Sequence, residues 1–300
     1  MVLKSISFYG LMAACSFLAC LVTSSRSISI KLFILAGQSN MVGFRSNMND
    51  LPSRLKKSQE KVIWYNNNNQ WTALQPPTEP SPTIKWWPAE KVAFGPEISF
   101  GKTISENLNQ IIALVKYSKG GTSLAEDWNP EIPDSQYNLM KERVNQAIAE
   151  LSALGYFVEI SGFIWMQGES DASNENWAKD YEFNLTNFIS QVRDDFDKPY
   201  LPFVYGMVHF GNNHHKPNGK VNCCGDIVRN AQVNVSETIP FTGLIETNNL
   251  SLHEDLLHFD SNGIITLGQN FAHSWLRINH DSDSASSIHT NQNKFSILTD

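Results

Sequence analysis

Short runs of apolar residues alternate with amphipathic stretches along most of the chain. Continuous apolar runs are typical of strands buried inside a sheet, and we expect strands at residues 32–36, 62–65, 111–117, 160–166, 200–208 and 241–246. Apolar residues at helical spacing predict helices that begin near residue 97 or cover residues 139–154, 177–192 and 262–276. This alternation predicts a parallel sheet with helices packed on both of its faces.

A proline-rich stretch interrupts the alternation between residues 66 and 88. Four consecutive asparagines and five prolines predict an irregular loop, and so long a loop in a compact domain is usually functional or mobile. The loop carries Trp71, Trp86 and Trp87. Each of these side chains could stack on a sugar ring or cover the edge of the core, and the sequence leaves both interpretations open.

The two ends of the chain differ from this middle part. Residues 1–25 contain the basic Lys4, a long apolar run and small residues at its exit, which is typical of a cleaved secretory signal peptide. A membrane anchor is the alternative, because the run approaches transmembrane length. Residues 279–300 are rich in Ser, Asp, Asn and His and predict a disordered tail. Residues 26–278 then form one α/β domain.

Charge and cysteine content narrow the compartment and the partners. Loss of Lys4 with the signal peptide moves the formal net charge from −7 to −8, which disfavours nucleic acid or an anionic membrane as a partner. Of the four cysteines only Cys223 and Cys224 remain, either as a vicinal disulfide or as free thiols. Three sequons, which favour glycosylation in a secreted protein, begin at Asn184, Asn234 and Asn249.

The first candidate for chemistry is Ser39, on the turn that follows the first predicted strand. The carboxyl ends of parallel strands open onto the crevice where α/β proteins bind ligands. Gly37 lacks the Cβ atom that would crowd a tight turn there. Serine is also common in turns and helix caps, so the interpretation of Ser39 as a nucleophile depends on partners elsewhere in the chain.

The segment at residues 253–260 supplies such partners. Asp255 and His258 are three residues apart, close enough on a turn for the carboxylate to bond one imidazole nitrogen and leave the other free. A carboxylate and an imidazole in this relation orient and activate a base for a serine nucleophile. Together with Ser39 they predict a Ser-His-Asp hydrolase.

Four blocks resemble, in order and spacing, the sialate O-acetylesterase-like domain. They are Gly-Gln-Ser-Asn-Met at residues 37–41, Lys-Gly-Gly-Thr at 119–122, Gln-Gly-Glu-Ser-Asp at 167–171 and Asp-Leu-Leu-His-Phe-Asp-Ser-Asn-Gly at 255–263. Carbohydrate esterase family six shares this domain, which belongs to the SGNH hydrolases. The resemblance implies a flavodoxin-like three-layer α/β/α sandwich and an O-deacetylase that uses no metal or other cofactor.

By matching position, the resemblance implies roles for individual residues. Ser39 would be the nucleophile, His258 the base and Asp255 the partner of the base. The oxyanion hole would consist of the Ser39 N–H, the Gly121 N–H and the side-chain amide of Gln167. The wider superfamily usually has an asparagine after a glycine in this third block, so the longer Gln167 side chain must reach from further back.

The roles of other polar residues stay open at this point. Glu97 lies in a Phe-Gly-Pro-Glu block also found in the family and is a rival to Asp255 as the partner of the base. Glu169 and Asp171 are expected to hold loops by hydrogen bonds rather than to take part in chemistry. We expect contacts with substrate, or support of the residues that make them, from Gln38, Asn40, Glu97, Glu169, Trp86 and Trp87.

These observations predict a secreted carbohydrate O-acetylesterase that removes acetyl groups from a sugar or polysaccharide through an acetyl-enzyme. The alternatives are a general carboxylesterase or lipase, and a non-catalytic carbohydrate-binding protein on the same fold. Histidines 209, 214 and 215, near the two cysteines, match no structural zinc spacing, and a surface loop is the better interpretation.

Overall fold

A computed structural model describes residues 28–78, 93–209 and 223–296. In this part of the chain a seven-stranded sheet has the strand order β3-β2-β4-β1-β5-β6-β7. All neighbouring strands run parallel except β2 and β3, which are antiparallel. The strands are β1 (Ile28–Gly37), β2 (Gln59–Tyr65), β3 (Trp71–Leu74), β4 (Ile112–Ser118), β5 (Tyr156–Met166), β6 (Phe203–Gly206) and β7 (Thr242–Ile245).

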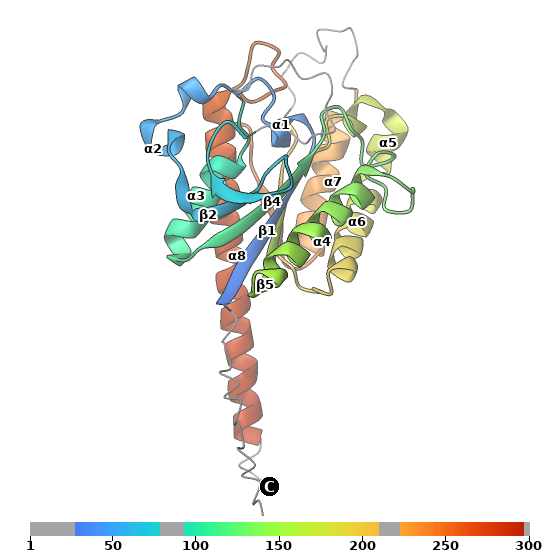
Figure 1. Ribbon diagram of the computed structural model, residues 1–300. Coiled ribbons are helices and arrows are strands. Elements are labelled where there is room, and N and C mark those ends of the chain that lie inside the picture. Colours follow the sequence, from blue (N-terminus) through green and yellow to red (C-terminus); the bar gives the residue numbers. More distant parts are fainter. Residues whose placement is uncertain (1–27, 79–92, 210–222, 297–300) are drawn as a thin grey trace, which may run out of the picture.

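Helices cover both faces of this sheet (Figure 1). The helices are α1 (Ser39–Val42), α2 (Ser53–Lys56), α3 (Glu97–Leu108), α4 (Gln136–Ala153), α5 (Glu175–Lys179), α6 (Tyr181–Asp195), α7 (Gly225–Thr238) and α8 (Ser261–Ser296). Helices α3 and α8 pack on one face, and α4, α6 and α7 pack on the other. The predicted α/β fold, with its mostly parallel sheet between two helical layers, is confirmed.

Alternate residues of β1 contribute to the two cores. Leu32, Ile34 and Ala36 pack with α4, α6 and α7, whereas Phe33 and Leu35 pack with α3 and α8. Successive side chains of a strand point to opposite faces of the sheet, so a central strand that is covered on both faces needs a continuous apolar sequence. The apolar run that begins at residue 32 meets that requirement.

Strand β3 lies where the sequence predicted an irregular loop. The four asparagines make a turn, in which Asn66 N donates to Gln70 O (2.9 Å) and Asn69 has a φ of 55°. Asparagine tolerates this left-handed conformation better than most residues, and the turn returns the chain antiparallel to β2. Trp71 then packs against Tyr65, with ring centroids 5.0 Å apart. Trp71 therefore covers the edge of the core.

Four helices also differ from the sequence prediction. Helix α7 was not predicted, although Val228, Ala231 and Val235 are buried at helical spacing. The helix predicted over residues 177–192 is divided at Asp180 into α5 and α6. Helix α8 continues from Ser261 to Ser296, beyond its predicted end at residue 276. The predicted end was the point at which apolar residues at helical spacing stop. The backbone hydrogen bonds of an α-helix do not depend on such residues.

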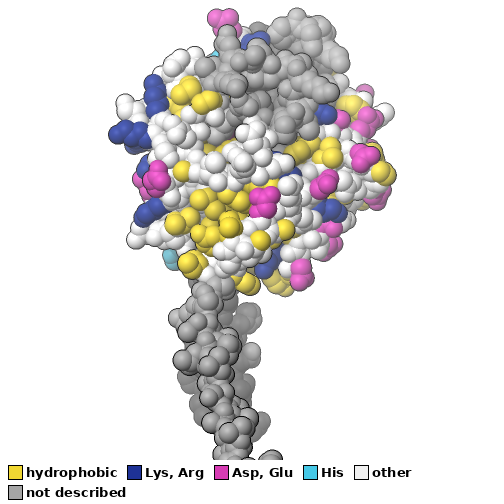
Figure 2. All heavy atoms as spheres, in the orientation of Figure 1, with side chains coloured by type: hydrophobic (Ala, Val, Ile, Leu, Met, Phe, Trp, Pro, Cys, Tyr) yellow, Lys and Arg dark blue, Asp and Glu magenta, His cyan; other side chains and the backbone are white. Residues whose placement is uncertain are grey.

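Charge is unevenly distributed over the surface. Figure 2 shows Lys and Arg side chains along the edge beside α2, and mostly Asp and Glu along the opposite edge, beside α5 and α6. None of the described helices combines the length and the apolar character needed to cross a membrane. The predicted signal peptide at residues 1–25 lies outside the described residues.

Candidate active site

Three of the four sequence blocks that carry the resemblance begin at the same edge of the sheet. Gly37, the last residue of β1, pairs with Ser118 at the end of β4 and with Met166 at the end of β5. The segments that follow these strands therefore start side by side, at the carboxyl ends where ligands bind in open α/β sheets.

Ser39 occupies the first position of the short helix α1. Gly37 precedes it with a φ of 144°, and a Cβ atom there would lie 2.1 Å from the carbonyl oxygen of Met166. The N–H of Gln38 donates to the same oxygen (2.9 Å), so the chain turns directly against β5. Only glycine fits this approach. The turn leaves Ser39 8 % exposed, with its hydroxyl at the rim of the sheet.

His258 and Asp255 reach Ser39 from the loop between β7 and α8. The Nε2 atom of His258 lies 3.0 Å from the Ser39 Oγ, and its Nδ1 atom lies 2.8 Å from Oδ2 of Asp255. The second carboxylate oxygen, Oδ1, accepts the N–H groups of Leu257 (3.1 Å) and His258 (3.0 Å). The structure thus brings together the three residues that the sequence proposed as a triad.

Asn40 fixes this loop against the serine turn. Its Oδ1 accepts the N–H of Phe259 (3.0 Å), and its Nδ2 donates to Glu169 Oε1 (2.7 Å) and to Leu257 O (3.3 Å). One side chain on α1 therefore joins the segments after β5 and β7. Through these hydrogen bonds, Asn40 and Glu169 hold the loop that carries His258 in place beside Ser39.

The surroundings of His258 keep its imidazole neutral. Burial lowers the pKa of His258, and although Asp255 raises it, Arg45 and His253 lower it further. Burial alone would raise the pKa of Asp255, but hydrogen bonds from the backbone and ring of His258 outweigh burial and hold that pKa below its ordinary value. An ionised carboxylate beside a neutral imidazole is the protonation state in which the imidazole can accept a proton.

Phe44 and Arg45 complete the wall around His258. The Phe44 ring lies 4.6 Å from the imidazole, between ring centroids, and Arg45 Nη1 lies 3.2 Å from Asp255 Oδ2. The carbonyl oxygen of Arg45 also lies 3.1 Å from His253 Nε2. Sequence reasoning missed both residues, because nothing in the spacing of the chain connects residue 45 to residue 255.

Two backbone N–H groups at this edge of the sheet have no acceptor among the described residues. They belong to Ser39 and Gly121. Gly121 has a φ of 72°, and a Cβ atom built on it would have no neighbour within 4 Å, so this glycine borders open space. Both segments begin at the same edge of the sheet.

The side chain of Gln167 does not reach this space, contrary to the prediction for the oxyanion hole. It is fully buried, and its Nε2 donates to Asp171 Oδ2 (2.6 Å) and Thr122 O (3.0 Å) and lies 3.2 Å from Gln38 Oε1. An amide group has two hydrogens, and both are used here. Gln167 therefore holds the rim together from inside.

The Gln38 amide is turned the opposite way. Its Oε1 accepts the N–H of Ser170 (3.4 Å) and faces Gln167 Nε2, which fixes the oxygen on the inner side. The Ser170 N–H requires an acceptor at this atom, so the orientation of the amide follows from that hydrogen bond. Within the described part of the chain the Gln38 Nε2 donates no hydrogen bond, and Gln38 directly precedes Ser39 in the sequence.

Asp171 braces the loop that carries Gly121. Its carboxylate accepts the N–H groups of Leu124 (2.9 Å to Oδ2) and Ala125 (3.0 Å to Oδ1) in addition to the Gln167 amide. Burial raises the pKa of Asp171 to about 6, although these hydrogen bonds lower it in part. Asp171 thus holds a rim loop by hydrogen bonds, which is the role that the sequence predicted for it.

Glu97 does not contact His258. It is fully buried under the serine turn, where Oε2 lies 2.7 Å from Lys116 Nζ and Oε1 accepts the N–H of Gly95 (2.9 Å) and the hydroxyl of Thr78. Burial lowers the pKa of Lys116, and Glu97 raises it. The rival assignment of Glu97 as the partner of the base therefore has no support in the geometry, which places Asp255 there.

Lys116 is the residue from which this ion pair could have been predicted in the sequence. It stands in the middle of the apolar run that forms β4, and a lysine is almost never fully buried without a partner. Its Nζ also donates to Val42 O (3.2 Å), the last residue of α1. The buried pair thereby supports the end of the helix that begins with Ser39.

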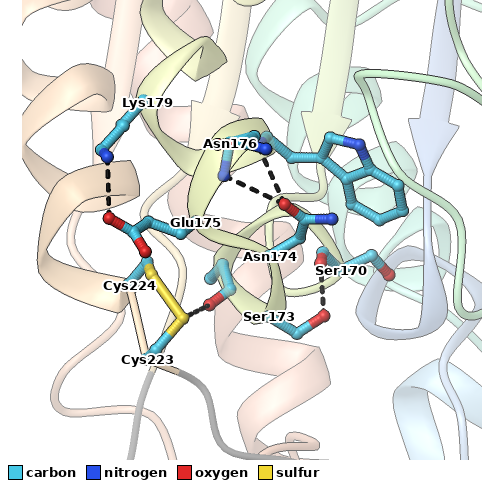
Figure 3. Close-up of a disulfide and its surroundings, with 10 residues drawn as sticks. Ser170, Ser173, Asn174, Glu175, Asn176, Lys179, Cys223 and Cys224 are labelled. Atoms are coloured by element: carbon cyan, nitrogen blue, oxygen red, sulfur yellow. Dashed lines mark hydrogen bonds and ion pairs between the residues drawn. A yellow bond between two sulfur atoms is a disulfide. The ribbon is translucent and has the colours of Figure 1, made fainter.

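Cys223 and Cys224 form a disulfide just before α7 (Figure 3). The pair lies beside the short 3-10 helix η2 (Asp171–Ser173), where the N–H of Cys224 donates to Ala172 O (3.2 Å). Of the two states that the sequence left open, the structure shows the disulfide. The hydrogen bond from Cys224, rather than the disulfide itself, attaches the start of α7 to the turn that carries Asp171.

The remaining predicted residues lie elsewhere. Trp86, Trp87, His214 and His215 lie outside the described residues. Among the residues that the structure describes, no three His, Cys, Asp or Glu side chains form a group able to hold a metal ion.

A hydroxyl, an imidazole and a carboxylate in sequence, at the strand-end crevice of an α/β sheet, are typical of hydrolases. The family of carbohydrate esterases described as sialic acid-specific acetylesterases matches residues 29–277. The chain belongs to this family and is a carbohydrate esterase, as the resemblance of the sequence blocks implied.

Known relatives agree with this placement. A probable carbohydrate esterase of Arabidopsis thaliana is 25% identical over 270 residues, which are 82% of this chain and 90% of that protein. The X-ray structure of the Arabidopsis protein has a TM-score of 0.67 at 22% identity, covering 83% of this chain and 98% of the other. A carbohydrate acetylesterase from Xanthomonas citri has a TM-score of 0.61 at 18% identity, covering 83% of this chain and 57% of that one. These two structures share the fold.

Proposed function

We propose that this protein is a secreted carbohydrate O-acetylesterase that uses Ser39, His258 and Asp255 in an acyl-enzyme mechanism. One observation carries the proposal: an unbroken series of contacts leads from the Ser39 hydroxyl through both ring nitrogens of His258 to the Asp255 carboxylate. Membership of the carbohydrate esterase family supports an acetylated carbohydrate as the substrate.

The first half of the reaction transfers the acetyl group to the enzyme. The Ser39 Oγ attacks the acetyl carbonyl carbon while His258 Nε2 takes the hydroxyl proton. Asp255, hydrogen-bonded to Nδ1, holds the required tautomer and stabilises the imidazolium. The tetrahedral intermediate then breaks its bond to the sugar oxygen, which leaves as an alcohol with the proton from His258.

Three donors are available for the negative oxygen of that intermediate. The N–H groups of Ser39 and Gly121 have no acceptor among the described residues, and we assign to the Nε2 of Gln38 the role that the sequence gave to Gln167. Preorganised donors of this kind contribute about 10²–10³ each to the rate. A water molecule, deprotonated by His258, finally hydrolyses the acetyl-Ser39 ester and releases acetate.

Secretion rests on the sequence of residues 1–25, which has the pattern of a signal peptide. Determination of the amino terminus of the mature protein tests this part: a start near residue 26 is expected. A mature protein that still begins at Met1 and sediments with membranes would contradict secretion and favour the anchor.

Hydrolysis of p-nitrophenyl acetate by wild-type and Ser39→Ala protein tests the enzyme. The variant removes only the Oγ atom of a small residue, so we expect an unchanged circular dichroism spectrum and complete loss of hydrolysis. Activity that persists in the folded variant would exclude Ser39 as the nucleophile.

Two further measurements separate the alternatives. A fluorophosphonate probe that labels Ser39 in the wild type excludes a non-catalytic sugar-binding protein, and failure to label favours it. Faster hydrolysis of the C8 than of the C2 p-nitrophenyl ester would identify a lipase or general carboxylesterase instead of an acetylesterase.

A further inference from the structure

A pocket lies on the flank of the molecule, and no residue of the triad lines it. It has a volume of about 370 Å³ and is formed by the loop after β4 and by the outer face of α6. Ligand sites typically have volumes of about 300–1,000 Å³, so the pocket is large enough for part of a small organic ligand. The reaction proposed above uses none of its residues.

Amide groups and one exposed aromatic ring line this pocket. Asn129 comes from the loop, and Asn184 and Asn187 come from α6 one turn apart. The side chains of Asn184 and Asn187 make no hydrogen bond with other described residues, and the Phe183 side chain is 69% exposed beside them. Amides can donate to and accept from hydroxyl groups, and an aromatic ring offers a flat apolar surface. Groups of these two kinds can bind the hydroxyls and the apolar face of a sugar ring.

The charge of the pocket distinguishes between classes of sugar. Glu131 is the one charged residue among those that line it, and no Lys or Arg side chain does so within the described part of the chain. The edge of the molecule beside α6 also carries mostly Asp and Glu (Figure 2). Like charges repel, so a polymer of uronic or sialic acids is disfavoured and a neutral glycan fits.

The pocket and the proposed oxyanion hole share one segment of chain. Leu124, in the pocket wall, follows Gly121 by three residues, so at most about 11 Å of extended chain separates them. Asp171 holds this segment in place through the N–H groups of Leu124 and Ala125. A chain of several sugars with one unit at Ser39 is long enough to reach a pocket that lies this close to Gly121.

On these grounds, and resting on the proposed esterase function, we propose that the pocket between the β4–α4 loop and α6 is a distal subsite for a neutral polysaccharide. The enzyme then acts on acetylated polymers of neutral sugars, and unacetylated units of the same chain occupy the distal subsite. The ester bond itself is cleaved only at Ser39.

The test compares two substrates on one enzyme. The ratio of kcat/KM for acetylated xylan to kcat/KM for p-nitrophenyl acetate is measured for wild-type protein, for Phe183→Ala/Asn187→Ala and for the control Phe157→Ala. Phe157 is 63% exposed and is the second residue of β5, at the opposite end of the sheet, so both changes remove exposed side chains. We expect the ratio to fall roughly tenfold in the double variant, through a higher KM for the polymer, and to stay the same in the control.

Each outcome separates the subsite from the esterase. An unchanged ratio in the double variant, with p-nitrophenyl acetate still hydrolysed, overturns the subsite and leaves the esterase in place. The subsite is also overturned if wild-type protein prefers acetylated xylose to acetylated xylan and acetylated mannose to acetylated glucomannan. A preference for acetylated pectin over both neutral polymers overturns it as well. If the wild type hydrolyses no ester at all, both proposals fail.

Asn184 adds an independent requirement, because it also begins a sequon. An N-glycan on Asn184 would fill the pocket, so the proposal requires Asn184 to be unmodified in the secreted protein. Mass spectrometry of the peptide that contains Asn184 decides this. A fully glycosylated Asn184 overturns the subsite, and an unmodified Asn184 supports it.

Discussion

Replacement of Asp255 by asparagine tests which carboxylate orients the base. The Asp255 carboxylate accepts the N–H groups of Leu257 and His258 on Oδ1, and His258 Nδ1 lies against Oδ2. In Asp255→Asn the amide oxygen keeps both backbone hydrogen bonds, so the loop stays in place. The amide NH₂ replaces Oδ2 and presents hydrogens to Nδ1. The ring proton then moves to Nε2, the nitrogen that faces the Ser39 hydroxyl. A protonated Nε2 cannot accept the hydroxyl proton.

The expected loss follows from this change of tautomer. The corresponding substitution in a serine protease triad lowers kcat by about 10⁴, which equals about 5.4 kcal/mol at 1.36 kcal/mol for each factor of ten. The assay is kcat for p-nitrophenyl acetate, with the melting temperature as a check on folding. We expect the melting temperature to change little, because Oδ1 retains its partners.

Glu97→Gln is the matched control, since it also exchanges a buried carboxylate for an amide. The substitution removes the negative charge that faces Lys116, and breaking a buried ion pair costs about 3–5 kcal/mol of stability. Activity must therefore be expressed per molecule that a fluorophosphonate can label. On that basis we expect Glu97→Gln to lose less than about tenfold in kcat, because Glu97 supports the turn and takes no part in proton transfer. The reasoning is refuted if Glu97→Gln loses about 10⁴ while Asp255→Asn keeps a tenth of the wild-type rate.

Two further predictions concern the donors and the pH profile. Gln38→Ala should lower kcat by about 10²–10³ with little loss of stability, whereas Gln167→Ala should cost about 1–3 kcal/mol in chemical denaturation because it leaves buried partners unsatisfied; the opposite pattern would restore Gln167 as the oxyanion donor. The pKa of His258 is lowered, and the base must be neutral, so kcat/KM should stay high somewhat below pH 6.5 and fall as the pH drops through the lowered pKa. Arg45→Ala removes a positive charge that lowers this pKa, so the acid limb of the profile should move to higher pH; a shift to lower pH would contradict the role of Arg45.

The sequence determined the fold and the triad because both leave local signals. Continuous apolar runs identify strands covered on both faces, and the segments after β1, β4 and β5 must share an edge if those strands are parallel and adjacent. Ser39, at the end of β1, could thus be assigned to the crevice. The three-residue spacing of Asp255 and His258 is itself local, so their contact could also be predicted.

Only the tertiary structure decided which of the polar residues face the substrate. Gln38 and Gln167 are both amides in sequence blocks at the rim, and the sequence favoured the second. The neighbours of each amide decide its direction, and those neighbours, Ser170 for one and Thr122 and Asp171 for the other, come from different segments. Hydrogen bonds of this kind depend on angles and distances that spacing along the chain does not contain.

The same reason separates Glu97 from Asp255. Both carboxylates lie in blocks typical of the family, and sequence alone left them as rivals. The fold places Glu97 beneath the serine turn against Lys116, and it places Asp255 beside His258. A buried lysine requires a nearby negative charge, and only the packing of β4 against α3 shows which carboxylate provides it.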